Sequence, residues 1–172
     1  MGPDGTMAAD SQFGVALTTL WHAVSLAGGA VGFVPPVDRP EVAAGAAAVV
    51  AQLRDGKSTA IALIADRQLV GFAKLAAGTG LMSHTGEITA VMVDPALQGL
   101  GLGGRLMTEM LALARLLGLE RISLSIREGA GLESFYARLG FVECGRRPGW
   151  VRLADGDDRD DIELWLDLRQ PQ

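Results

Sequence analysis

The 172-residue chain has few of the residues that build disulfides and metal sites. Its one cysteine, Cys144, has no partner for an intrachain disulfide, and its two histidines, His22 and His84, lie too far apart to resemble a metal-ligand cluster. We therefore expect no metal, and the scarcity of cysteine fits a cytoplasmic protein. Cys144 follows two apolar residues in a short extended run, so we expect it to be a small core residue.

Basic charge and long apolar runs are also scarce. The chain carries 15 Lys and Arg against 20 Asp and Glu, a formal net charge of -5. No diffuse basic field is present to hold a phosphate backbone, so we expect no nucleic-acid partner. The most apolar stretch, residues 13–36, is interrupted by Trp21, His22 and several glycines, and no Lys or Arg precedes it. We therefore predict neither a signal peptide nor a membrane partner.

Length and composition predict one folded domain. At 172 residues, of which 49% are hydrophobic, the chain can bury one ordinary core. Residues 1–11 include Gly2, Pro3 and Gly5 and are expected to form a flexible leader, which leaves residues 12–172 as a single domain. Most soluble oligomers are two-fold dimers, so a homodimer is the assembly we expect if the chain associates.

Helical and extended patterns alternate along this domain. One helix is predicted where Leu106, Met110, Leu113 and Leu117 share a face, with Gly118 at its end. The other predicted helices span residues 15–26, 41–53 and 132–139, and the predicted strands span residues 59–65, 69–76, 87–93, 121–126, 141–145 and 162–168. This order predicts an α/β fold.

The most informative segment holds four glycines within six residues: Gly99, Gly101, Gly103 and Gly104. It joins the strand over 87–93 to a helix, where converging N–H groups bind an anion such as a diphosphate. The same glycines satisfy the GxGxxG dinucleotide fingerprint. In that fold, however, the strand enters the glycines directly and an acidic residue follows about twenty positions on, whereas here residues 94–98 intervene and position 124 is Leu. A nucleotide-binding oxidoreductase is therefore the less favoured alternative.

Two signatures in this region resemble those of the GNAT superfamily of N-acetyltransferases. Gln98, Gly101 and Gly103 match its cofactor motif, which is Gln or Arg, two residues, Gly, one residue, then Gly or Ala. Tyr136, followed after three residues by Gly140-Phe141, is similar to the second signature of the family.

The resemblance extends to one branch of the family and has one departure. Residues 32–36, Glu87 and residues 145–150 are similar to the branch that includes tabtoxin-resistance acetyltransferases. The departure is Gly129, which stands where many members have an Asn that contacts the cofactor.

The resemblance implies a GNAT-like fold and acetyl-coenzyme A (acetyl-CoA) as the acyl donor. It implies a mixed central β-sheet flanked by about four helices and splayed between its fourth and fifth strands, residues 87–93 and 121–126. The pantetheine arm would lie in that gap. The cofactor-binding residues would be Val91, Met92, Val93, Gln98, Gly99, Leu100, Gly101, Leu102, Gly103 and Gly104.

Two side chains are candidates for proton transfer. The resemblance implies that Tyr136, the only tyrosine, donates a proton to the departing thiolate, although a Tyr that only packs in its helix is also consistent with the spacing. Strand alternation places Glu87 on the face of Thr89, Val91 and Val93, and the resemblance strengthens its role as general base. The alternatives for the base are His84 and water, with Glu87 then a solvated strand-end residue.

The predicted function is therefore direct transfer of acetyl, in a ternary complex, to a primary amine of a small molecule. An antibiotic- or toxin-like amine, an amino acid and a polyamine all fit as acceptors. A non-catalytic coenzyme A-binding regulatory module is the alternative from a different class. It would keep the glycines and lack the proton-transfer groups.

Overall fold

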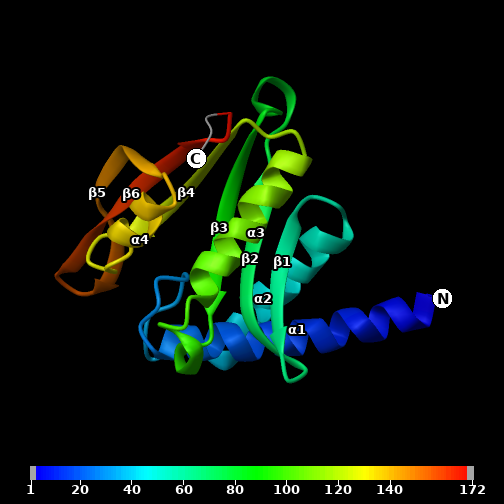
Figure 1. Ribbon diagram of the computed structural model, residues 1–172. Coiled ribbons are helices and arrows are strands. Elements are labelled where there is room, and N and C mark those ends of the chain that lie inside the picture. Colours follow the sequence, from blue (N-terminus) through cyan, green and yellow to red (C-terminus); the bar gives the residue numbers. More distant parts are fainter. Residues whose placement is uncertain (1–2, 170–172) are drawn as a thin grey trace. The chain divides into compact units, whose positions relative to one another are not determined.

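The computed structural model describes the backbone of residues 3–169 and the side chains of residues 11–169 (Figure 1). The helices in this part are α1 (Pro3–Leu26), α2 (Arg39–Arg54), α3 (Leu102–Leu116) and α4 (Glu133–Arg138), with 3-10 turns η1 (Gly80–Met82) and η2 (Pro95–Leu97). The strands are β1 (Thr59–Ala65), β2 (Gln68–Ala77), β3 (Thr85–Val93), β4 (Arg121–Arg127), β5 (Val142–Ala154) and β6 (Asp157–Asp167).

The strands form one open, mixed, six-stranded sheet in the order β1-β2-β3-β4-β6-β5. β3 and β4 are parallel, whereas β6 is antiparallel to both β4 and β5. This arrangement confirms the predicted fold class. The two strands at the predicted splay are the third and fourth within residues 3–169, because only β1 and β2 precede β3 there. Within residues 3–169, β6 pairs antiparallel with β4 and β5, so this sheet is not the doubly wound parallel sheet that the oxidoreductase alternative predicts.

The chain divides into two compact units. Unit 1 comprises the chain up to Lys74 together with Ala90–Met107, and unit 2 comprises Leu75–Thr89 and the chain from Thr108 onward. Unit 1 therefore holds α1, α2, β1, most of β2, the second half of β3 and the glycine segment. Unit 2 holds the first half of β3, most of α3, α4 and strands β4 to β6.

The core of unit 1 forms where α1 and α2 pack against β2. α1 buries Leu17, Leu20 and Val24, which recur at helical spacing, and these side chains cluster with Phe72 of β2 and Met92 of β3. α2 buries Val42, Ala46 and Val49 on one face. In Figure 1 both helices cross behind β1. The second half of β3 is thus fixed by an apolar core on one side of its strand.

Unit 2 is built on β4 and β6, which bury alternate residues. The buried side chains are Ile122, Leu124 and Ile126 in β4 and Ile162, Leu164 and Leu166 in β6. At the start of β3, a Cβ on Gly86 would lie 2.8 Å from Leu119 and 2.9 Å from Leu75. Glycine is therefore needed there, because apolar side chains pack directly on the backbone.

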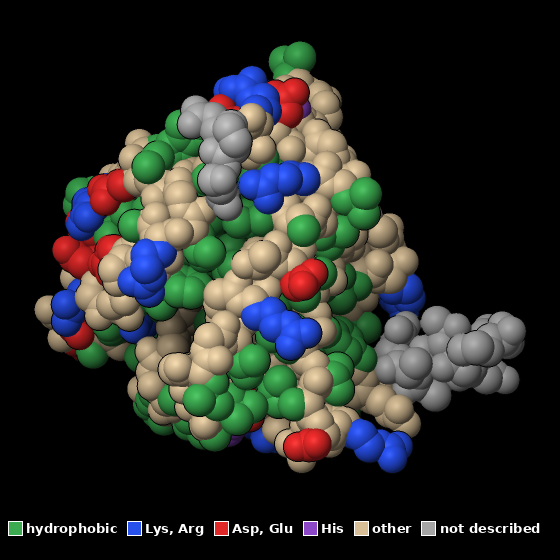
Figure 2. Space-filling view, viewed as in Figure 1, with side chains coloured by type: hydrophobic (Ala, Val, Ile, Leu, Met, Phe, Trp, Pro, Cys, Tyr) green, Lys and Arg blue, Asp and Glu red, His purple; other side chains and the backbone are tan. Residues whose placement is uncertain are grey.

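The β5–β6 hairpin is longer than predicted. The acidic residues from Asp157 to Asp161 belong to strand β6, where arginines form ion pairs with each of them. The pairs are Arg146–Asp160, Arg147–Asp161 and Arg152–Asp158, and within β6 Arg159–Asp157. Figure 2 shows acidic and basic side chains intermingled over this region.

Two other expectations differ from the structure. α1 already begins at Pro3, inside the segment expected to be a leader, while Met1 and Gly2 lie outside the described residues. Cys144 is exposed, so the prediction of a core cysteine is wrong. It lies on β5, an edge strand in which nearly every residue is accessible. Partial desolvation by neighbouring atoms and the nearby Glu163 carboxylate raise the pKa of its thiol, which disfavours the reactive thiolate.

Candidate functional site

Strand β3 runs beside β4 for only its first residues. The parallel register begins at Thr85 and ends at the pair Glu87 and Ser123. β4 continues to Arg127 with β6 as its partner. One edge of β3 over residues 88–93 is therefore left unpaired by β4. The N–H and C=O groups of such an edge can bind an extended ligand as an added strand would.

An extra residue interrupts β3 at Ala90. Ala90 has φ 54, in the left-handed region that residues other than glycine rarely adopt. Two hydrogen bonds frame it: Gly78 N–H donates to the Thr85 carbonyl, and Asp94 N–H donates to the Val70 carbonyl, each at 2.9 Å. Between these bonds the chain advances eight residues from Val70 to Gly78 but nine from Thr85 to Asp94. β3 therefore carries a β-bulge, which re-aims the backbone groups that follow it.

The bulge interrupts the alternation of side chains that the sequence predicts for β3. Val93 was expected on the face of Glu87, with Met92 on the opposite face. Instead Met92 and Val93 are both buried, Val91 is half-buried and Glu87 is exposed. Period-two alternation fails here because a bulge puts two residues opposite one. Nothing in the sequence marks Ala90, since alanine does not signal a positive φ.

Polar groups fix the turn that follows β3. The Asp94 carboxylate accepts a hydrogen bond from Ala96 N–H at 2.9 Å, which caps η2. Gln98, the first residue of the cofactor motif, donates from Nε2 to the Val93 carbonyl at 3.2 Å. Its side chain thus ties the glycine segment to the end of β3.

The glycine segment presents open backbone before α3. Gly99 and Gly101 both have φ 80, and a Cβ at either would meet no atom within 4 Å. Between them, Leu100 is 71% exposed. α3 begins at Leu102, and Arg105 N–H donates to the Gly101 carbonyl at 3.1 Å. The N–H groups before Arg105 lack intrahelical partners, so they can bind an anion.

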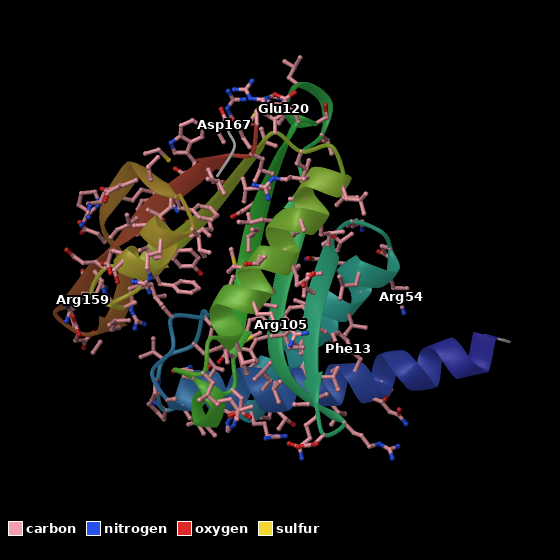
Figure 3. The ribbon with its side chains drawn as sticks, viewed as in Figure 1. Phe13, Arg54, Arg105, Glu120, Arg159 and Asp167 are labelled. Carbon is pink, nitrogen blue, oxygen red and sulfur yellow. The ribbon has the colours of Figure 1, made fainter. Side chains whose placement is uncertain are left out.

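Two further residues of this segment lie in the first turn of α3. Gly103 and Gly104 are half-buried, and a Cβ on Gly104 would meet no atom within 4 Å. Arg105 follows them and is exposed (Figure 3). The cofactor-motif residues and residues 91–93 thus form one continuous stretch of unit 1.

Tyr136 is a buried residue of the short helix α4 in unit 2. It is 4% exposed and its ring contacts Phe141 edge-on, with centroids 5.7 Å apart. Burial raises the pKa of its phenol from 10.0 to about 12. The phenol is therefore protonated at neutral pH and can act as a hydrogen-bond donor.

The two candidates for the base are both exposed in unit 2. Glu87 is the last β3 residue paired with β4, and its side chain is exposed rather than enclosed by apolar side chains. His84 precedes β3, and its carbonyl accepts hydrogen bonds from the N–H groups of Glu120 and Arg121. The backbone of His84 is thus structural, while its imidazole is open to solvent.

Gly129, which stands where the resemblance leads us to expect Asn, lies in a turn. Its φ is 75, a conformation that Asn adopts more readily than other residues with side chains. Glycine therefore preserves the backbone while removing the amide. A Cβ there would approach Arg159 at 3.5 Å.

Several other features bear on partners. A hollow of about 360 Å³ lies between α1 and α2, with a mainly apolar lining that includes Val15, Ala47 and Arg54, and it contains no candidate residue. Among the described helices, none is both long and apolar enough to cross a membrane. The described side chains form no group of three or more metal-binding residues.

Known proteins resemble this chain in sequence and in fold. The amino-acid acetyltransferase of Mycobacterium tuberculosis (strain ATCC 25618 / H37Rv) is 40% identical over 75 residues, which are 44% of this chain and 41% of that protein. The chain thus matches about two fifths of the length of this relative.

Solved structures share the fold at low sequence identity. An N-acetyltransferase from Staphylococcus aureus Mu50 has a TM-score of 0.75 at 16% identity, covering 93% of this chain and 94% of its own. The Salmonella typhimurium protein yncA, solved with its cofactor acetyl-CoA, has a TM-score of 0.71 at 22% identity, covering 92% of this chain and 90% of its own.

A family model supplies the classification. The model of the Acetyltransferase (GNAT) family matches residues 30–141, well over half of the chain. The matched part contains β3 with its bulge, the glycine segment and Tyr136. The chain therefore belongs to the GNAT family of acetyltransferases.

Proposed function

We propose that this protein is an N-acetyltransferase that moves the acetyl group of acetyl-CoA to the primary amine of a small molecule. One observation carries the proposal: a bulged strand, one edge of which is not paired with β4 over residues 88–93, leads directly into open glycine backbone at the start of α3. Such a strand and turn can bind an elongated donor with amide groups at one end and a diphosphate at the other.

The residues of this stretch fit the donor. Backbone groups of Val91 and Val93 lie on the strand edge and would pair with the pantetheine amides. N–H groups from Gly99 to Gly104 would bind the diphosphate, since Gly99 and Gly101 leave the approach open. The exposed guanidinium of Arg105 adds positive charge to the same turn. Met92, Gln98, Leu100, Leu102 and Gly103 complete the proposed binding segment.

The reaction is direct attack of the amine on the thioester carbonyl. The C–N bond forms as the C–S bond breaks, the amine loses one proton and the thiolate gains one. Backbone N–H near Val91 would stabilise the negative charge that develops on the carbonyl oxygen. No covalent enzyme intermediate is required.

Tyr136 is the proposed acid. A phenol with a pKa of about 12 is a weaker acid than a thiol, whose pKa is about 8.5. We therefore assign Tyr136 the role of donating a hydrogen bond to the departing thiolate. The proton that the thiolate gains comes from the phenol, which regains one from water, and the amine releases its own proton to water through Glu87. A role as a packing residue would leave turnover unaffected by loss of the hydroxyl.

Glu87 is the proposed base, acting through water. Its exposure suits a carboxylate that receives a proton from a solvated ammonium rather than from a buried one. His84 and bulk water are the competing bases. A change in the pH dependence of the rate, on removal of the Glu87 carboxylate, distinguishes them.

Charge and the amino-acid acetyltransferase relative support an order in which to test acceptors. Asp157, Asp158, Asp160 and Asp161 of the hairpin are each paired with an arginine, which favours a neutral or zwitterionic amine over a polycation. The relative makes amino acids the first acceptors to test. The cytoplasmic location of the protein and its assembly as a homodimer remain predictions.

The decisive assay is release of coenzyme A thiol. The protein is incubated with acetyl-CoA and a panel of amino acids, polyamines and antibiotic-like amines, and free thiol is measured with and without each amine. We expect amine-dependent release, and thermal stabilisation by acetyl-CoA but not by NADH. Stabilisation by acetyl-CoA without thiol release for any amine would favour the coenzyme A-binding module.

A further inference from the structure

The hydroxyl of Thr89 is buried without a hydrogen-bond partner. Its Oγ1 atom is inaccessible to solvent, although the residue as a whole is half-buried. Buried hydroxyls in folded proteins are nearly always paired with protein, water or ligand. An unpaired hydroxyl lowers the stability of the ligand-free fold, and a bound ligand that hydrogen-bonds to it supplies the missing partner.

Thr89 lies between the end of the pairing of β3 with β4 and the bulge in β3. It follows the last pair with β4 by two residues and directly precedes the bulged residue Ala90. The donor-binding stretch proposed above begins immediately afterwards, at Val91. A polar group at this point of the strand is therefore next to the backbone that would hold the reacting end of the donor.

We propose that Thr89 positions the acceptor, its Oγ1 accepting a hydrogen bond from the N–H of the attacking amine. This rests on the proposed acetyltransferase function and names a further residue for it. A neutral primary amine has two N–H donors and one lone pair. One N–H bound to Oγ1 limits rotation of the amine and leaves the lone pair free to attack the thioester carbon.

Threonine at this position offers a clean substitution. Thr89→Val keeps the branched shape and removes only the hydroxyl. In the ligand-free protein this removes an unpaired polar atom, so the melting temperature should equal or exceed that of the parent. For the acceptor amine, kcat/KM should fall about tenfold, as expected for the loss of one hydrogen bond in the reacting complex. Affinity for acetyl-CoA should stay within about twofold of the parent.

Two further variants complete the design. Thr89→Ser restores the hydroxyl without the methyl group and should recover most of the lost kcat/KM. Ser58 provides a matched control, because its Oγ is also buried without a partner, while the residue precedes β1 and lies outside the proposed donor and acceptor residues. Ser58→Ala should leave kcat/KM unchanged.

The outcomes separate this inference from the proposed function. A parent that releases thiol with an amine, together with a fully active Thr89→Val variant, overturns the role of Thr89 and leaves the function standing. A lower melting temperature with unchanged kcat/KM in Thr89→Val shows a structural hydroxyl, bonded to protein or water, and also overturns it. Weaker acetyl-CoA binding with unchanged amine KM assigns the hydroxyl to the donor and refutes the acceptor role. If the parent is inactive with every amine, both the role of Thr89 and the proposed function are overturned.

Discussion

Gly101→Ala tests the placement of the donor most directly, because the structure separates its effect on the fold from its effect on the ligand. Gly101 has φ 80, and the space around its Cα is open. An alanine there meets no atom of the protein but must adopt the left-handed conformation, which costs about 1–2 kcal/mol. For a chain of this size that lowers the melting temperature by about 2–8 °C.

Donor binding adds a second effect. A methyl group at Gly101 would occupy the open space through which a diphosphate reaches the backbone N–H groups. We expect the dissociation constant of acetyl-CoA to rise at least about tenfold, or roughly 1.4 kcal/mol. At a concentration that is a hundred times the parent constant, acetyl-CoA stabilises the parent by about 2.7 kcal/mol and the variant by at most about 1.4 kcal/mol. The thermal shift should therefore fall to half or less.

Gly118→Ala is the matched control. Gly118 follows the end of α3, has φ 76 and is likewise open around its Cα, but it is not one of the proposed binding residues. It should lose a similar amount of stability and keep the full acetyl-CoA shift. Thermal unfolding of the parent and both variants, with and without acetyl-CoA, decides the matter. Equal acetyl-CoA shifts in all three proteins would refute our placement of the donor.

Three further predictions concern the proton-transfer groups. Tyr136→Phe should lower turnover about a hundredfold to ten-thousandfold while changing acetyl-CoA affinity little, and unchanged single-turnover rates would leave Tyr136 as a packing residue. Glu87→Gln should lower the rate with amine and move its rise to higher pH; an unaltered pH profile excludes Glu87 as the base. Because Tyr136 is the only tyrosine, its ultraviolet absorbance should titrate near pH 12 in the folded protein and near pH 10 in denaturant. Its folded pKa is raised, so the stabilisation from the neutral phenol is complete below pH 10 and is lost as the pH rises through about 12. Titration near pH 10 in both the folded and the denatured protein would contradict the burial of Tyr136.

The sequence predicted the family and the order of elements, because these depend on local patterns. Leu106 and Met110 recur on the buried face of α3, and the glycine motif stands at its start, as expected. The same pattern failed at Leu117, which is exposed beyond the end of the helix. Periodicity identifies a helix face but does not determine where tertiary packing ends.

Neither the bulge in β3 nor the exposure of the candidate base Glu87 could be predicted. Ala90 adopts its positive φ because, between the flanking hydrogen bonds, the chain advances nine residues from Thr85 to Asp94 opposite eight from Val70 to Gly78, a tertiary constraint without a local signature. Glu87 is exposed although it is still paired with Ser123 of β4, and alternation does not encode which part of a strand face is covered by other elements. Thr89 was placed on a face by alternation, yet its unpaired hydroxyl is visible only in three dimensions.

The arginine–aspartate pairs of the β5–β6 hairpin have a consequence for local motion. β5 exposes almost every residue, including Trp150 at 67%, so little apolar burial holds it. Its order depends on the cross-strand bonds and on ion pairs that salt screens over about 8 Å at physiological ionic strength. Amide hydrogens of β5 should therefore exchange with deuterium sooner as ionic strength rises, while those of β4, whose alternate side chains are buried, stay protected. Salt would thus loosen this hairpin without unfolding the protein.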